Sequence, residues 1–149
     1  MILNRQRAVR LSRRPLELFL RRLQDELGLG EAQITICLVS DREMARMNAA
    51  YRKKMGTTDV LSFPAVARRK PARTGRGISG SRRDMPLGDI AIAPATARRN
   101  AKMYGRPLAS ELRIVILHGV LHLLGYDHET DEGKMQRIEN RLRKRLRLA

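Results

Sequence analysis

The chain of 149 residues is long enough for one domain with a single core, and we expect one domain over residues 1–149. It has 31 Lys and Arg against 15 Asp and Glu, and this formal net charge of +16 favours an anionic partner, nucleic acid above all. A single cysteine excludes an internal disulfide framework and fits a reducing compartment. No apolar run approaches the ~20 residues of a membrane span, and the first residues are too charged for a signal peptide. We therefore expect a cytoplasmic protein without a membrane partner.

The first expected elements are a strand and a helix. Residues 5–11 are weakly strand-like, and Pro15 can open a helix at its first position. That helix has apolar residues at helical spacing and ends at Gly28. Its apolar residues are Leu16, Phe19, Leu20, Leu23 and Leu27.

The next pair of expected elements is again a strand and a helix. Residues 32–39 predict a buried strand, and Cys37 within it is expected to be an inert thiol. Ser40 and Glu43 form a capping box, which predicts a helix over residues 41–51.

A short strand over residues 60–63 is followed by a basic segment over residues 66–85. Glycines, serines and a proline separate the arginines of this segment, and Asp84 is its one acidic residue. We expect a mobile basic loop within the domain, because regular patterning resumes directly after it. Four of its arginines are candidate contacts for substrate phosphates: Arg68, Arg69, Arg82 and Arg83.

The second half of the chain is richer in helix. A strand over residues 87–93 precedes a helix from Pro94 to residues 104–105, and a long helix spans residues 107–124. The last helix is expected from about Asp131, and its apolar stripe consists of Met135, Ile138, Leu142 and Leu146. Because strands and helices interleave, we predict an α+β or α/β fold with one sheet of about four strands and about five helices.

All three histidines of the chain lie within eleven residues, near the end of the long helix. His118 and His122 are four residues apart and share one face of a helix. Gly125 can end that helix, so that the exit turn carries His128 back towards the pair. Three neutral imidazoles would match an open tetrahedral zinc site whose fourth position is left to water. Nickel or copper also suits such ligands.

Two other interpretations of the histidines remain open. They could be surface or hydrogen-bonded core residues, although burial among apolar neighbours without a partner would cost about 1–3 kcal/mol per unsatisfied group. Their spacing also resembles the long zinc motif of metzincin proteases, but Gly119 stands where those enzymes have a glutamate base. We expect Gly119 instead to allow close backbone packing. Asp127 is a candidate hydrogen-bond partner of a metal ligand, a candidate base, or a cap of the turn.

Three segments resemble the signatures of the YbeY family, in that family's order. The first runs over residues 48–54 and 58–64, the second over residues 87–92, and the third over residues 111–128 with the histidines. The resemblance implies an endoribonuclease that acts on single-stranded RNA, matures the 3′ end of small-subunit (16S) ribosomal RNA and takes part in ribosome quality control. It also implies a mixed sheet of about four strands with helices around it.

The same resemblance implies site residues. It implies a zinc ion held by His118, His122 and His128, and an important arginine that matches Arg52. Met55-Gly56-Thr57 departs from the usual Asp-x-Pro of the first signature, and the basic loop is longer than the typical version.

We therefore predict a zinc-dependent, single-strand-specific endoribonuclease, a hydrolase of rRNA processing whose partners are rRNA precursors and the small ribosomal subunit. Arg52 would pair bidentately with a phosphate and offset developing charge. The alternative is an RNA-binding ribosome-assembly factor with a mainly structural zinc, and a third possibility is a metalloprotease. Aromatic residues make up only 3% of the chain, so contacts to the RNA backbone should dominate over base stacking. The sequence does not identify the general base.

Overall fold

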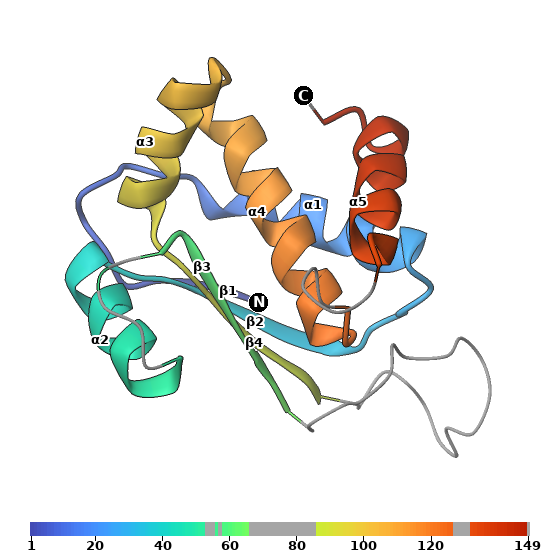
Figure 1. Cartoon of the computed structure of the whole chain (residues 1–149), viewed down its shortest axis with the longest axis horizontal. Helices are drawn as coiled ribbons and strands as arrows, with labels where there is room; N and C mark the ends of the chain where they lie inside the picture. The colour runs from blue at the N-terminus through green and yellow to red at the C-terminus, as the bar shows by residue number, and fades with distance from the viewer. Residues whose placement is uncertain (53–55, 57, 66–85, 127–131, 149) are drawn as a thin grey trace.

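The computed structural model describes residues 1–52, 56, 58–65, 86–126 and 132–148, which form a four-stranded sheet with helices on both faces (Figure 1). The strands are β1 (Ile2–Asn4), β2 (Gln33–Leu38), β3 (Val60–Pro64) and β4 (Pro86–Ile92). Their order in the sheet is β1-β2-β4-β3. Strands β1, β2 and β4 are parallel, and β3 is antiparallel to β4. The predicted mixed sheet is therefore confirmed.

The helices divide unequally between the two faces of the sheet. They are α1 (Arg13–Glu26), α2 (Asp41–Tyr51), α3 (Pro94–Tyr104), α4 (Leu108–Leu123) and α5 (Lys134–Arg145). Helix α2 covers one face, and the other four lie on the opposite face (Figure 1). Side chains alternate along β2 accordingly, because Ile36 packs in the larger core with α1 and α4 while Cys37 contacts the smaller core under α2. In the described part of the chain, no helix has the length and apolar character needed to cross a membrane.

Three element boundaries differ from the sequence-based expectation. The first strand is β1 rather than residues 5–11, because the Gln6 side chain accepts from Val9 N and donates to Val9 O, which folds that segment into a local turn. Helix α1 begins at Arg13, with Pro15 inside its first turn, where a missing N–H costs little. Helix α5 begins at Lys134 rather than about Asp131, because Gly133 before it has a left-handed φ of +81°.

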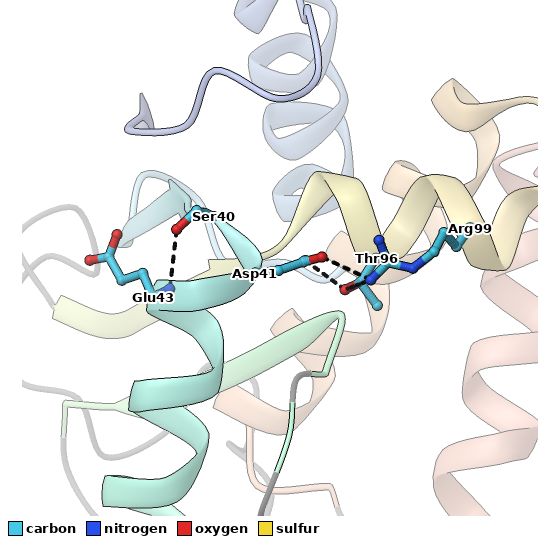
Figure 2. A network of polar contacts seen from close by, with 5 residues as sticks. All are labelled: Ser40, Asp41, Glu43, Thr96 and Arg99. Atoms are coloured by element: carbon cyan, nitrogen blue, oxygen red, sulfur yellow. Dashed lines mark hydrogen bonds and ion pairs between the residues drawn. The ribbon is translucent and has the colours of Figure 1, made fainter.

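The remaining boundaries agree with the sequence to within one or two residues. Helix α2 spans the predicted residues, and Ser40 Oγ accepts from Glu43 N at 3.1 Å, as a capping serine should. The carboxylate of Asp41 then ties this helix to α3, accepting from Thr96 Oγ1 at 2.7 Å and from Arg99 Nη2 at 2.8 Å (Figure 2). Burial acts to raise the pKa of Asp41, but these hydrogen bonds and the Arg99 charge outweigh it, so the pKa lies below its usual value.

Helix α4 is the central element of the fold. Ten of its sixteen residues are buried, and it contacts α1, α3, α5, β3 and β4. A Cβ added at Gly119 would lie 3.0 Å from Ile90 Cγ2, so the glycine lets α4 approach β4 closely. Ser62 Oγ donates to Gly119 O at 2.9 Å and fixes β3 to the same point. The expected packing role of Gly119 is confirmed, because any side chain at this position would press on Ile90.

Gly88 forms a second close contact, between β4 and the end of α4. The pairing of β2 with β4 shifts register here, so β4 carries a bulge next to Gly88, whose φ is +140°. A Cβ at Gly88 would lie 2.4 Å from Phe63 O and 2.9 Å from Leu123 Cδ2. Only glycine therefore fits this position.

We expect Gly88→Ala to lower the free energy of unfolding by about 2–4 kcal/mol, because it adds both backbone strain and a clash with a backbone oxygen. Gly30→Ala is the matched control, since Gly30 also has a positive φ, +58°, but a Cβ there would have no atom within 4 Å. That control should cost about 1 kcal/mol. Urea unfolding of both variants measures the difference, and equal losses would contradict the crowding at Gly88.

Candidate functional site

Two of the three histidines lie side by side near the carboxyl end of α4. His118 Nε2 and His122 Nε2 are 3.0 Å apart, and the two rings meet edge to face with centroids 4.6 Å apart. Both side chains are half-buried. Two nitrogens bound to one zinc ion at tetrahedral angles lie roughly 3.4 Å apart, so a small separation of the rings would admit an ion. The pair therefore fits two ligands of one metal.

The remaining predicted members of the site are not all within the described residues. His128 and Asp127 lie outside them, as do Arg68, Arg69, Arg82 and Arg83 of the basic segment. Within the described ranges, no group of three or more His, Cys, Asp or Glu side chains is placed to hold a metal ion. The structure thus brings two predicted ligands together, and the third ligand stays a prediction.

A carboxylate that the sequence analysis missed lies behind the first histidine. Glu139 of α5 is 6% exposed, and its Oε1 is 3.0 Å from His118 Nδ1. An ionised carboxylate only accepts hydrogen bonds, so an ionised Glu139 would accept the hydrogen bond of His118 Nδ1–H and leave the lone pair on Nε2. The buried positions of α5 are Met135, Glu139 and Leu142, followed by Leu146 just beyond the helix. Glu139 therefore lies in the buried stripe of α5. An acidic residue at helical spacing among the apolar residues of this stripe was the feature of the sequence that could have identified it.

Arg52 caps the carboxyl end of α2 and is exposed. Its backbone N–H donates to Asn48 O at 3.0 Å, while the buried Asn48 side chain donates from Nδ2 to Gly56 O at 3.0 Å. Beside it, the Tyr51 ring packs against Phe63 of β3 with centroids 4.5 Å apart. The hydrogen bonds of the turn and this aromatic pair fix the backbone position of Arg52, from which the guanidinium group extends.

Arg52 and the histidine pair come from opposite faces of the sheet, on α2 and α4. The edge strand β3 contacts both helices, because successive residues of a strand point to opposite faces of the sheet. Ser62 bonds to α4 at Gly119, and Phe63 packs against Tyr51 next to Arg52. Strand β3 therefore links the two helices that carry the candidate residues.

Two other titratable groups are not candidates for catalysis. Burial raises the pKa of the Cys37 thiol, and the nearby Asp89 raises it further, so the thiol stays protonated, as expected of an inert cysteine. Burial also raises the pKa of Glu111 on α4, and Arg106, whose Nε lies 3.3 Å from Glu111 Oε2, partly offsets that rise. Glu111 is thus accounted for by an ion pair at the start of α4.

Known proteins of one family match the chain over nearly its whole length. The sequence model of the family described as Endoribonuclease YbeY matches residues 2–147. A Koribacter versatilis protein of that name is 38% identical over 148 residues, which cover 99% of this chain and 86% of that protein. A Solibacter usitatus protein of the same name is 42% identical, over 95% of this chain and 85% of its own length.

The solution structure of a Thermotoga maritima protein has the same fold. It superposes with a TM-score of 0.58 over 99% of this chain and 92% of its own, at 24% sequence identity. The family match extends over nearly the whole sequence and includes the segments that carry His118, His122 and Arg52. The chain therefore belongs to the endoribonuclease YbeY family.

Proposed function

We propose that this protein is a zinc-dependent endoribonuclease that cleaves single-stranded RNA and matures the 3′ end of small-subunit (16S) ribosomal RNA. The enzyme class follows from the family, whose members are named endoribonucleases, so the predicted hydrolase acting on RNA is confirmed. The observation that carries the metal dependence is the 3.0 Å approach of His118 Nε2 to His122 Nε2. The net charge of +16 supports a polyanionic substrate.

The proposed metal site consists of His118, His122 and His128. Neutral imidazoles suit zinc, and they also suit other divalent transition metals. When bound, the ion supplies Lewis acidity that polarises a phosphoryl oxygen or acidifies water. His118 and His122 would hold it by their Nε2 atoms, and Asp127 is proposed to hydrogen-bond to one of the ligands.

The substrate is proposed to pass around the β3 edge of the sheet. Arg52 on one face would bind a phosphate bidentately and offset charge that develops in the transition state. The histidine pair on the other face would act on the neighbouring phosphodiester. Arg68, Arg69, Arg82 and Arg83 would add phosphate contacts from the basic segment of the single domain, in the cytoplasm and on the small ribosomal subunit.

A second candidate function has one observation in its favour. The His118–Glu139 contact joins α4 to α5, so a metal bound there would also stabilise the packing of the last helix. This favours the assembly factor with a mainly structural zinc, which would bind RNA without cutting it. The metalloprotease is not supported, because Gly119 stands where such enzymes have the glutamate base.

Metal removal should separate these candidates. We expect a chelator, or His122→Ala, to lower cleavage of a ribosomal RNA fragment on the order of 100-fold or more, because the Lewis acid is lost. Asn140→Ala, an exposed change on α5, is the control and should retain full activity. Equal cleavage by all samples would contradict the proposal. The assembly factor would be supported by tight RNA binding without cleavage in any sample, together with a melting temperature that falls when the metal is removed.

Arg52 should act on the reaction and not on the metal. We expect Arg52→Ala to lower kcat/KM by about 10²–10³-fold, as for removal of one group that stabilises transition-state charge, with zinc content unchanged. Arg52→Lys should recover only part of the loss, because an ammonium group cannot bind a phosphate bidentately. Arg46→Ala, an exposed arginine on the same helix, is the matched control. Equal rates for the Arg46 and Arg52 variants would remove Arg52 from the site.

The basic segment should contribute to affinity through counterion release. Replacing Arg68, Arg69, Arg82 and Arg83 by Ala should reduce the slope of log K against log salt by ~0.7 for each phosphate that the variant no longer neutralises. Filter binding of a single-stranded RNA at several salt concentrations measures this slope. An unchanged slope would show that these arginines do not touch the substrate.

A further inference from the structure

Glu139 is the one acidic residue of α5, a helix otherwise rich in basic side chains. It is 6% exposed, and an ionised carboxylate is costly to bury unless it is paired. Its Oε1 lies 3.0 Å from His118 Nδ1, on the side of the ring opposite the His122 contact. A buried acid therefore stands directly behind a proposed metal ligand.

We propose that Glu139 is a positioning residue that fixes the tautomer and ring orientation of His118, so that the last helix sets the metal affinity of the site. The inference rests on the proposed function, because it concerns the same metal. Glu139 touches neither substrate nor metal in this role and acts only through His118. The family resemblance and the histidine spacing do not identify it.

The tautomer follows from the chemistry of the two contacts. The carboxylate can only accept, so the proton of neutral His118 is held on Nδ1 and the Nε2 lone pair is free of a proton. In the metal-free protein this Nε2 then accepts from His122 Nε2 at 3.0 Å. Without Glu139, His118 could carry its proton on Nε2, which would oppose ligation. Mutation of a carboxylate that hydrogen-bonds to a metal-binding histidine typically lowers metal affinity or activity 10–100-fold.

The packing of α5 holds the carboxylate in place. Met135 and Leu142, one turn on either side of Glu139, are both buried in the larger core. Arg145 Nε at the end of the helix pairs with Glu26 Oε2 of α1 at 2.6 Å. One turn after Glu139, the Arg143 charge acts on Glu111 of α4, where it lowers a pKa that burial raises. Helix α5 is thus held by apolar packing around Glu139 and by the ion pair with α1, and Glu139 is aligned before any metal binds.

Zinc affinity of the full chain, measured by competition with a chelator of known affinity, tests the proposal. We expect Glu139→Leu, which fits the buried stripe, to weaken zinc binding by about 10–100-fold, and Glu139→Gln to have a smaller effect. Glu111→Gln is the matched control, because it neutralises another buried carboxylate on α4 itself and should leave the affinity unchanged. Equal affinity of wild type and both Glu139 variants would overturn the proposal.

The tautomer of His118 gives a second readout, which a purely structural role of Glu139 would not move. Nitrogen-15 NMR of the metal-free protein should show His118 protonated on Nδ1 in the wild type and shifted towards Nε2 in Glu139→Leu. Glu139→Gln supplies the comparison if the leucine variant does not fold. Absence of zinc binding by the wild type would refute the proposed metal function, while the tautomer would still test Glu139. An unchanged tautomer in the Glu139→Leu variant would overturn the inference.

Discussion

Burial of α4 on nearly all sides is the constraint on which the rest of the structure depends. The helix contacts three other helices and two strands, and ten of its sixteen residues are removed from water. Polar groups on such a helix need partners, because an unsatisfied buried group costs about 1–3 kcal/mol. His118 and His122 meet this requirement through each other and through Glu139. The same contacts that make their burial tolerable also bring the two Nε2 atoms to within 3.0 Å of each other.

The edge strand β3 connects this helix with the other face of the sheet. Its alternation sends Ser62 to the backbone of α4 and Phe63 to the aromatic pair beside Arg52. An edge strand is short of hydrogen-bond partners on one side, and here its side chains anchor it on both faces. A phosphodiester chain that followed this edge would meet the arginine and the histidines in turn. The fold therefore links α2 and α4, which carry these candidate residues, through one edge strand.

Local signals in the sequence predicted most of the fold. The capping serine before α2 and the Pro and Gly at the ends of α3 mark boundaries by their own backbone preferences, so these helices were predicted closely. The position of β1 was not predicted, because Ile2 becomes a strand residue only by pairing with Ile36 of β2. Histidine spacing predicted the contact between His118 and His122. Glu139 was missed because its burial depends on how α5 docks against α4, which no local pattern encodes.

The histidine pair lies at the carboxyl end of α4, and this position has an electrostatic consequence. Aligned peptide dipoles place roughly half a negative elementary charge at that end of a helix, and the Glu139 carboxylate adds to it. The chain as a whole, with a net charge of +16, repels small cations and attracts phosphates. The helix terminus thus adds a local negative contribution to the field of a basic molecule. A cation bound at the histidine pair, as proposed, would be favoured by this end of the helix even though the molecule as a whole attracts polyanions.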